Sequence, residues 1–134
     1  MTECLFCRIV EKKVPCHTVY EDNNVLAFLD IFPHTKGHTV VIPKKHAVVL
    51  QDLDVLESAA FIHGIDAAMQ RIEKVLSPEG FNVGWNHGDA GGQVVKHLHT
   101  HIFPRWSGDG GSSMHAIINN PSGDVSEIAK LFVL

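Results

Sequence analysis

Cysteine is scarce in this 134-residue chain, and no long apolar run is present. Three cysteines are an odd number without an obvious disulfide framework, which favours a reducing, cytoplasmic compartment. No stretch approaches the roughly 20 apolar residues of a membrane-spanning helix. Residues 1–11 also lack the basic-then-apolar layout of a signal peptide. We therefore expect a protein without a membrane partner.

Basic residues are also fewer than acidic ones. Lysine and arginine number 11 against 15 aspartates and glutamates, and the formal net charge is −4. Because nucleic acid polymers normally bind basic surfaces, this balance argues against DNA or RNA as the partner. A small nucleotide stays compatible, because one phosphate needs only a few local donors. The length and the 45% of hydrophobic residues suit one globular core.

The residue patterns predict an α+β fold. A short helix is expected over residues 5–12 and one long helix over 54–76, where Asp54 and Glu57 can form a capping box. Five strands are expected over residues 18–21, 25–30, 38–42, 81–86 and 96–103. The long helix carries an apolar stripe that we expect to be buried: Phe61, Ile65, Ala68, Ile72 and Val75. Hairpin-length links predict a five-stranded antiparallel sheet with the long helix across one face.

The last part of the chain has a different composition. Residues 108–113 are rich in glycine and serine, and residues 124–132 follow as a possible short helix capped by Asp124. We therefore divide the chain into a main domain over residues 1–106 and a C-terminal tail over residues 107–134.

Histidine is the outlier in composition, with ten residues, three of them at alternate positions: His97, His99 and His101. On a strand these three side chains point to one face, while Leu98 and Ile102 point to the core. Crowding three imidazoles raises the cost of protonating them all, so some should be neutral near pH 7. Neutral imidazoles serve as metal ligands or as nucleophiles, and this pattern alone leaves both open.

A glycine-bearing loop, residues 88–93, lies directly before the histidines. Glycines let backbone N–H groups approach an anion closely, as in a phosphate-binding nest. A glycine loop that leads into a histidine strand therefore favours chemistry at a phosphate.

The run GGQVVKHLHTHI, residues 91–102, resembles the signature of the histidine-triad (HIT) family. Residues 19–22, 26–31 and 36–44 are similar to further family segments, and the resemblance is collinear over roughly residues 4–106. It implies the HIT-like fold and a homodimer whose two sheets join. It also implies a nucleotide site in each protomer and transfer of a nucleotidyl group to a histidine.

The resemblance also implies roles for individual residues. His99 would be the nucleophile, His101 would bind the same phosphate, and His38 would hold the nucleophile's ring in its attacking tautomer. With Gln93 these three make up the expected catalytic set. Asn86 and Gln93 would contact phosphate oxygens, with the backbone of Gly92 and Val94 beside them, and Asp30 would bind the ribose hydroxyls. The expected base pocket consists of Leu5, Phe6, Ile9, Phe28 and Ile31.

Two positions depart from the family pattern. Val94 stands where the phosphoramidase branch commonly has serine or threonine, whose hydroxyl assists the leaving group. Thr100 replaces an apolar spacer, and its β-branched side chain is compatible with a strand. The remaining histidines are expected on the surface or in loops: His17, His34, His63, His87 and His115.

Cys4 and Cys7 form a C-x-x-C pair near the N-terminus. A redox pair would be expected after a strand, and only three residues precede Cys4, so a zinc site or two unlinked thiols fit better. Similarity to a zinc-bearing branch of microbial HIT proteins indicates His46 and His97 as the other two ligands. Such a closed Cys2His2 site would hold a structural zinc ion.

The resulting leading hypothesis is an enzyme that attacks the α-phosphate of a purine nucleoside 5′-monophosphate derivative. A phosphoramidate, an acyl-adenylate or a dinucleoside polyphosphate would fit, and a nucleotidyl-histidine intermediate would release the monophosphate. One alternative is a non-catalytic, zinc-stabilised nucleotide-binding or scaffold protein. Another is a metal-handling protein, which would bind several metal ions per chain.

Overall fold

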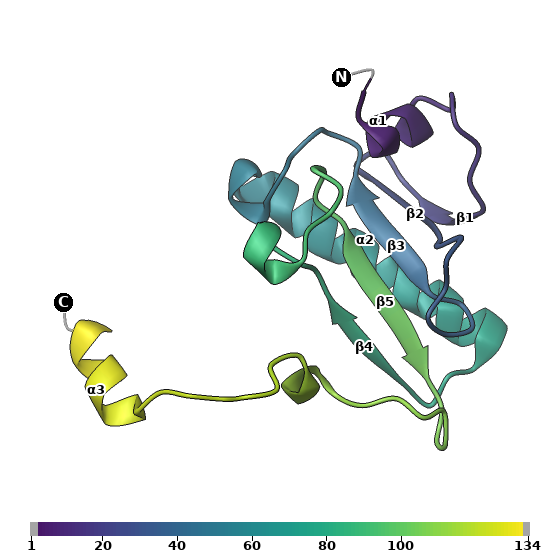
Figure 1. Ribbon diagram of the computed structural model, residues 1–134. Helices are drawn as coiled ribbons and strands as arrows, with labels where there is room; N and C mark the ends of the chain where they lie inside the picture. The colour runs from purple at the N-terminus through teal and green to yellow at the C-terminus, as the bar shows by residue number, and fades with distance from the viewer. Residues whose placement is uncertain (1–2, 133–134) are drawn as a thin grey trace.

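Five strands form one antiparallel sheet in the computed structural model of the chain, in which residues 3–132 are described (Figure 1). The strand order is β1-β2-β3-β5-β4. The strands are β1 (Thr18–Glu21), β2 (Val25–Leu29), β3 (Thr39–Pro43), β4 (Gly80–Gly84) and β5 (Thr100–Arg105). This arrangement confirms the predicted α+β fold.

Helix α2 (Val55–Leu76) lies across one face of the sheet (Figure 1). It begins at the predicted capping box, in which Asp54 and Glu57 each accept the other's backbone N–H. Four of the five predicted apolar positions are buried in the core between helix and sheet: Phe61, Ile65, Ala68 and Ile72. The prediction for Val75 was wrong, since it is 64% exposed. The buried stripe continues four residues after Ile72, at Leu76, which packs against the core instead.

Gly64 lets α2 approach the sheet closely. A Cβ atom at this position would lie only 2.3 Å from a methyl group of Val25 on β2. The backbone of the helix therefore sits directly on the strand, and any larger residue would push the two apart.

Helix α1 (Leu5–Val10) lies on the opposite face of the sheet (Figure 1). Its Phe6 and Ile9 are buried with Leu26, Phe28 and other even-numbered residues of β2 and β3 in a second apolar cluster. The helix ends before the predicted Lys12, which has a positive φ of 64° that does not continue a helix.

Strand β5 begins later than predicted, at Thr100 rather than residue 96. Extending its register with β3 would bring Leu98 opposite Pro43, which has no N–H for the ladder. The N–H of Leu98 instead donates to the carbonyl of Ala47 at 2.7 Å. His97 and His99 therefore precede the strand, although Leu98 and Ile102 still point into the core as predicted.

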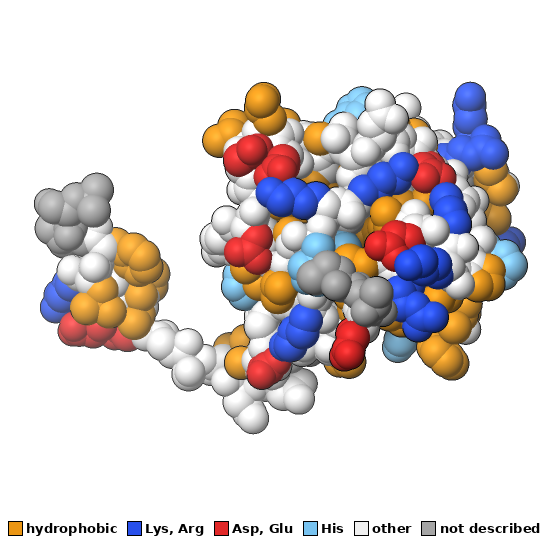
Figure 2. Space-filling view, turned by 90° about the horizontal axis from the view of Figure 1, so that it is seen from above, with side chains coloured by type: hydrophobic (Ala, Val, Ile, Leu, Met, Phe, Trp, Pro, Cys, Tyr) orange, Lys and Arg blue, Asp and Glu red, His pale blue; other side chains and the backbone are white. Residues whose placement is uncertain are grey.

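The segment after β5 leads away from the sheet (Figure 1). It contains the short 3-10 helix η3 (Met114–Ala116), helix α3 (Val125–Ala129), capped by Asp124, and the turn η4 (Lys130–Phe132). Figure 2 shows apolar side chains on the outlying α3 segment, where Val125 and Leu131 are exposed. Within residues 3–132, no helix is both long enough and apolar enough to cross a membrane.

Candidate functional site

Three histidines gather on the face of the sheet opposite α2. The ring of His101, on β5, lies 5.2 Å from that of His99 and 5.1 Å from that of His38, which directly precedes β3. His38 and His99 are buried, and His101 is partly buried. The fold thus brings together a side chain of β5 with those of the residues directly before β3 and β5 in one small polar cluster.

The orientation of His99 is set by the backbone. Its Nδ1 atom lies 2.7 Å from the carbonyl oxygen of His97, which can only accept a hydrogen bond. Nδ1 therefore carries the hydrogen, and Nε2 of the neutral ring has a lone pair. Phe6 packs edge-on against the ring at 5.1 Å and holds it in place. His99 thus presents a nucleophilic nitrogen.

His38 contacts His101 rather than His99, which differs from the role expected for it. The backbone N–H of His34 donates to Nδ1 of His38 at 3.2 Å, so Nε2 of His38 carries the hydrogen. That Nε2 lies 2.9 Å from Nδ1 of His101, which must accept. The hydrogen of neutral His101 is therefore on Nε2, where it can donate to an anion.

Burial keeps the rings of His38 and His101 neutral. Desolvation, reinforced by the neighbouring His99 and His38, lowers the pKa of His101 from 6.5 to about 4. Desolvation also lowers the pKa of His38, against the opposing charge of Asp30. At neutral pH His38 and His101 therefore act through N–H donors and lone pairs rather than through positive charge.

Asp30 stands beside this cluster. One of its carboxylate oxygens accepts the backbone N–H of Phe32 at 2.8 Å, and the other lies 3.6 Å from Nε2 of His38. Asp30, His38 and His101 each offer a ligand atom within 4.8 Å of the others. The hydrogen bond between the two rings already pairs their facing nitrogens, so no cation is needed there.

Gln93 does not face the solvent as a phosphate ligand would. It is 5% exposed, and its Nε2 donates to the carbonyls of Val48 and Val95 at 2.8 and 3.1 Å. Its Oε1 accepts the N–H of Gly88 at 3.0 Å. Both amide hydrogens are thus used, so in this structure Gln93 anchors the glycine loop instead of offering a donor to substrate.

The other expected phosphate contacts lie on the surface of that loop. Val94 is 85% exposed, and Asn86 is exposed next to Gly92. Gly92 has a φ of 95°, and a Cβ atom there would lie 3.6 Å from Cγ of Asn86. Glycine at position 92 therefore permits both the positive φ of the turn and the close approach to Asn86.

The residues expected to bind the base divide into two groups. Phe6, Ile9 and Phe28 are buried together, with the rings of Phe6 and Phe28 5.7 Å apart. Leu5 and Ile31 are 46% and 73% exposed. The buried group reaches His99 through Phe6, while the other two side chains are exposed to solvent.

Cys4, Cys7, His46 and His97 form a second cluster, in which all four donor atoms lie within 4.8 Å of one another. The Sγ–Nδ1 distances are 3.4 Å for Cys4–His97, 3.2 Å for Cys7–His46 and 3.6 Å for Cys7–His97. A tetrahedral zinc ion with ordinary bond lengths separates its sulfur and nitrogen ligands by about 3.5 Å. The four side chains therefore fit such an ion.

The protonation of this cluster also suits a cation. Nε2 of His97 donates to the carbonyl of Pro43 at 2.8 Å, so its Nδ1 lone pair faces the sulfur atoms. Burial and the adjacent Cys4 raise the pKa of the Cys7 thiol to about 11, and burial lowers the pKa of His97. Both shifts disfavour charge without a partner ion, so a bound cation would displace the thiol protons.

The comparisons with known proteins decide the family. A family model described as the HIT domain matches residues 11–108. The chain belongs to the HIT family.

Several relatives and structures resemble the whole chain. The uncharacterized HIT-like protein MJ0866 of Methanocaldococcus jannaschii is 41% identical over 127 residues, covering 95% of this chain and 96% of that protein. The crystal structure of SMU.412c from Streptococcus mutans has a TM-score of 0.85 at 35% identity, covering 98% of this chain and 82% of that one.

Some relatives have names that state an activity, among them an adenylylsulfatase of Arabidopsis thaliana. Adenosine 5′-monophosphoramidase hnt1 of Schizosaccharomyces pombe is 42% identical over 102 residues, which are 76% of this chain and 74% of that protein. AP-4-A phosphorylase of Mycobacterium tuberculosis is 44% identical over 86 residues, 63% of this chain and 44% of that protein. HIT proteins related to this chain thus act on nucleotides.

Some functional atoms of this HIT protein left no signal in the sequence. The backbone N–H of His34, which sets the tautomer of His38, belongs to a residue that we expected only on the surface or in a loop. The carbonyls of His97 and Pro43 likewise act through the main chain, which any residue provides. Sequence motifs identify side chains, so these main-chain hydrogen-bond partners can be found only once the fold is known.

Proposed function

We propose that this protein hydrolyses a purine nucleoside 5′-monophosphate derivative by nucleophilic attack of His99 on the α-phosphate. The observation that carries this proposal is the hydrogen bond from Nδ1 of His99 to the His97 carbonyl, which places the lone pair of the neutral ring on Nε2. The neighbouring Nε2–H of His101 supplies a donor for the phosphate oxygens.

The reaction proceeds in two balanced steps. Nε2 of His99 forms a bond to phosphorus while the bond to the leaving group breaks. The leaving group keeps that electron pair and takes a proton from solvent. Water then attacks the nucleotidyl-histidine, the N–P bond breaks, and a proton returns to solvent. The products are the nucleoside monophosphate and the protonated leaving group, and His99 recovers its lone pair.

The remaining expected contacts belong to the same proposal. Asp30 accepts hydrogen bonds from ribose hydroxyls through the oxygen that faces His38, and the apolar group around Phe6 and Phe28 holds the base. Asn86 and the backbone at Gly92 and Val94 line the phosphates. The relatives named as a phosphoramidase and an AP-4-A phosphorylase support a nucleotide substrate with a leaving group on the α-phosphate.

We further propose that Cys4, Cys7, His46 and His97 hold a structural zinc ion. All four ligands come from the protein, which closes the coordination sphere to water and substrate. When bound, zinc supplies a cross-link between α1 and the segment that carries His99. The chemistry at phosphorus stays with the histidines.

A homodimer in the cytoplasm completes the proposal. β4 is an edge strand that pairs regularly with β5 over five residue pairs, whereas β1, at the other edge, has an irregularity between Thr18 and Tyr20. The regular edge suits the joining of two sheets. The cysteines are all free thiols, as a reducing compartment allows.

The test is turnover of adenosine and guanosine phosphoramidates, an acyl-adenylate, and diadenosine tri- and tetraphosphate. We expect the wild type to release monophosphate and His99→Ala to lose at least about a thousandfold in kcat. His63→Ala, an exposed histidine on α2, is the matched control and should retain full activity. Binding of nucleotide with equal inactivity of wild type and His99→Ala would instead support the non-catalytic binding protein.

A further inference from the structure

A cavity of about 340 Å³ lies on the α2 side of the sheet, away from the side chains of both histidine-containing clusters. It is bounded by β1, the end of β2, the loop that precedes β3 and the last part of α2. We propose that this cavity binds a small amphipathic anion, the carboxylate form of a medium-chain fatty acid. The inference is independent of the function proposed above.

The inner surface of the cavity is aliphatic. Three of the lining side chains belong to the core under α2 or pack against it, and two are exposed. These residues are Val19, Ile72 and Leu76 in the first group, and Leu29 and Val75, 38% and 64% exposed, in the second. Val75 belongs to the apolar stripe of α2, yet the core does not cover it. An alkyl chain in the cavity would remove this apolar surface from water.

Lys36 and Arg71 add positive charge to the same cavity. Within residues 3–132 neither side chain forms an ion pair with a carboxylate. The lysines that do so lie elsewhere: Lys12, Lys13, Lys44, Lys45, Lys96 and Lys130. Nζ of Lys36 lies 5.9 Å from the ring centre of Trp106, a contact that leaves its charge unbalanced. A carboxylate would supply the counter-charge.

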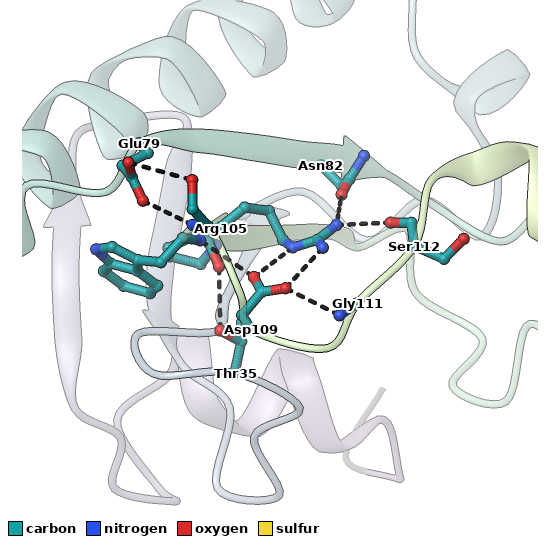
Figure 3. A network of polar contacts seen from close by, with 10 residues as sticks. Thr35, Glu79, Asn82, Arg105, Asp109, Gly111 and Ser112 are labelled. Carbon is teal, nitrogen blue, oxygen red and sulfur yellow. Dashed lines mark hydrogen bonds and ion pairs between the residues drawn. The ribbon is translucent and has the colours of Figure 1, made fainter.

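Arg105 shows how the fold satisfies a guanidinium that it uses for structure. It donates from Nε and Nη2 to Asp109 at 2.7 and 2.8 Å. Its Nη1 donates to the side chain of Asn82 and to the carbonyl of Ser112 (Figure 3). The described residues offer the side chain of Arg71 no such partner, so its donors stay available to a ligand.

The loop before β3 is held in place around Lys36. A Cβ atom at Gly37 would lie 2.4 Å from Cδ1 of Leu76, so the loop rests directly on the end of α2. The hydroxyl of Thr35 donates to the carbonyl of Pro104 on β5 at 3.0 Å (Figure 3). The residues on both sides of Lys36 are thus fixed, which makes the cavity preformed.

The lining separates a fatty acid from other kinds of ligand. Among the described lining residues there is no aromatic side chain, so a nucleobase would find no ring to stack on. There is no acidic side chain either, which excludes a cation. Two cations suit a single carboxylate, whereas a polyphosphate needs more donors than these aliphatic walls provide. The volume is near the lower end of the roughly 300–1,000 Å³ of ligand sites, which suits a medium-length chain.

The experiment titrates octanoate into the full chain by calorimetry and by NMR of the isotope-labelled protein. We expect saturable binding, with shifts of the amide signals of Gly37 and Val75 and none at Phe6, in the apolar cluster on the opposite face. Octyltrimethylammonium has the same chain and the opposite charge, and it should not shift the Gly37 and Val75 signals.

Arg71→Glu reverses one of the two charges at an exposed position of α2. It should weaken octanoate binding by at least about tenfold. Lys74→Glu makes the same charge change at an exposed position of the helix that does not line the cavity, and it should retain the wild-type affinity.

Equal affinity of Arg71→Glu and the wild type would overturn the inference, as would octanoate shifts centred on Phe6. Absence of saturable binding would overturn it too. An octanoate affinity that falls as the protein concentration rises would assign the cavity to a second copy of the chain and would likewise reject the fatty acid.

Discussion

Nδ1 of His99 donates to the carbonyl of His97, and Nε2 of His97 donates to the carbonyl of Pro43. The neutral rings of His99 and His97 therefore have opposite tautomers, which gives two histidines of the same motif different chemistry. In a neutral His99 the lone pair is on Nε2, while Nδ1 of His97 faces two sulfur atoms. A single backbone partner per ring therefore separates the proposed nucleophile from the proposed metal ligand.

The lowered pKa of His101 predicts a loss of stability in acid. The unfolded chain binds a proton at this residue near pH 6.5, while the folded protein does so only at about pH 4. Because the unfolded state binds more protons in this interval, stability falls as pH decreases from 6.5 to 4, by about 3 kcal/mol at most. Urea unfolding at several pH values measures this dependence.

His101→Gln isolates that contribution, since the variant has no group that titrates at this position. The difference in unfolding free energy between pH 7.5 and pH 5 should be smaller in the variant than in the wild type. Equal differences in both proteins would show that His101 is not the residue responsible.

Thr100 is a polar residue in a buried environment. Its side chain is fully buried, and its Oγ1 has no hydrogen-bond partner within residues 3–132. An unpaired buried hydroxyl costs about 1–3 kcal/mol. Thr100→Val keeps the shape and removes this cost, so we expect the free energy of unfolding to rise by about 1 kcal/mol. The hydroxyl of Thr35 donates a hydrogen bond to the Pro104 carbonyl, so Thr35→Val should instead lower the free energy of unfolding.

At the scale of elements, the loop from Gly88 to Val95 depends on one buried amide. Gln93 ties this loop to Val48, 45 positions earlier in the chain, and closes it through Gly88 and Val95. The loop carries the backbone groups expected at the phosphates. The buried side chain of Gln93 therefore stabilises the conformation of this loop.

Gln93→Leu tests this anchoring role. The substitution leaves three backbone groups without their partner, so we expect a loss of about 2–3 kcal/mol in unfolding free energy together with reduced activity. Gln51→Leu, at an exposed position, should change neither. If Gln93 bound the phosphate directly, activity would fall while the unfolding free energy stayed near the wild-type value.

Across the molecule as a whole, the Cys–His cluster joins the beginning of the chain to the segment that carries His99. Cys4 and His97 are 93 positions apart, and Cys7 meets His46 from the segment after β3. A metal ion at this point closes several long loops at once. Its binding energy then becomes stability of the fold.

Cys4→Ser tests the metal site with little other disturbance. Cys4 is the N-cap of α1, and serine caps a helix well, so the substitution removes a ligand and preserves the cap. We expect one zinc ion per chain in the wild type, its loss in the variant, and a fall in Tm of at least about 5 °C. Cys16→Ser lies outside the cluster and should retain both metal and Tm. Equal metal content in all three proteins would contradict the site.

The elements and their faces could be predicted from the residues alone. Helix α2, its capping box and the burial of Leu98 and Ile102 follow from local periodicity, which each segment carries in itself. The start of β5 could not be predicted in this way, because it depends on which residue of β3 stands opposite, and that residue is Pro43. Strand ends are set by partners that the local pattern does not contain.

Residue types and their spacing set which side chains are available for chemistry: the alternating histidines, the C-x-x-C pair and the glycine loop. Their partners, in contrast, depend on the fold. It joins His38 to His101, turns Gln93 inward, and surrounds Arg105 with Asn82, Asp109 and the Ser112 carbonyl. Residue type sets the donors and acceptors, whereas tautomer, charge balance and access depend on groups that folding brings from distant parts of the chain.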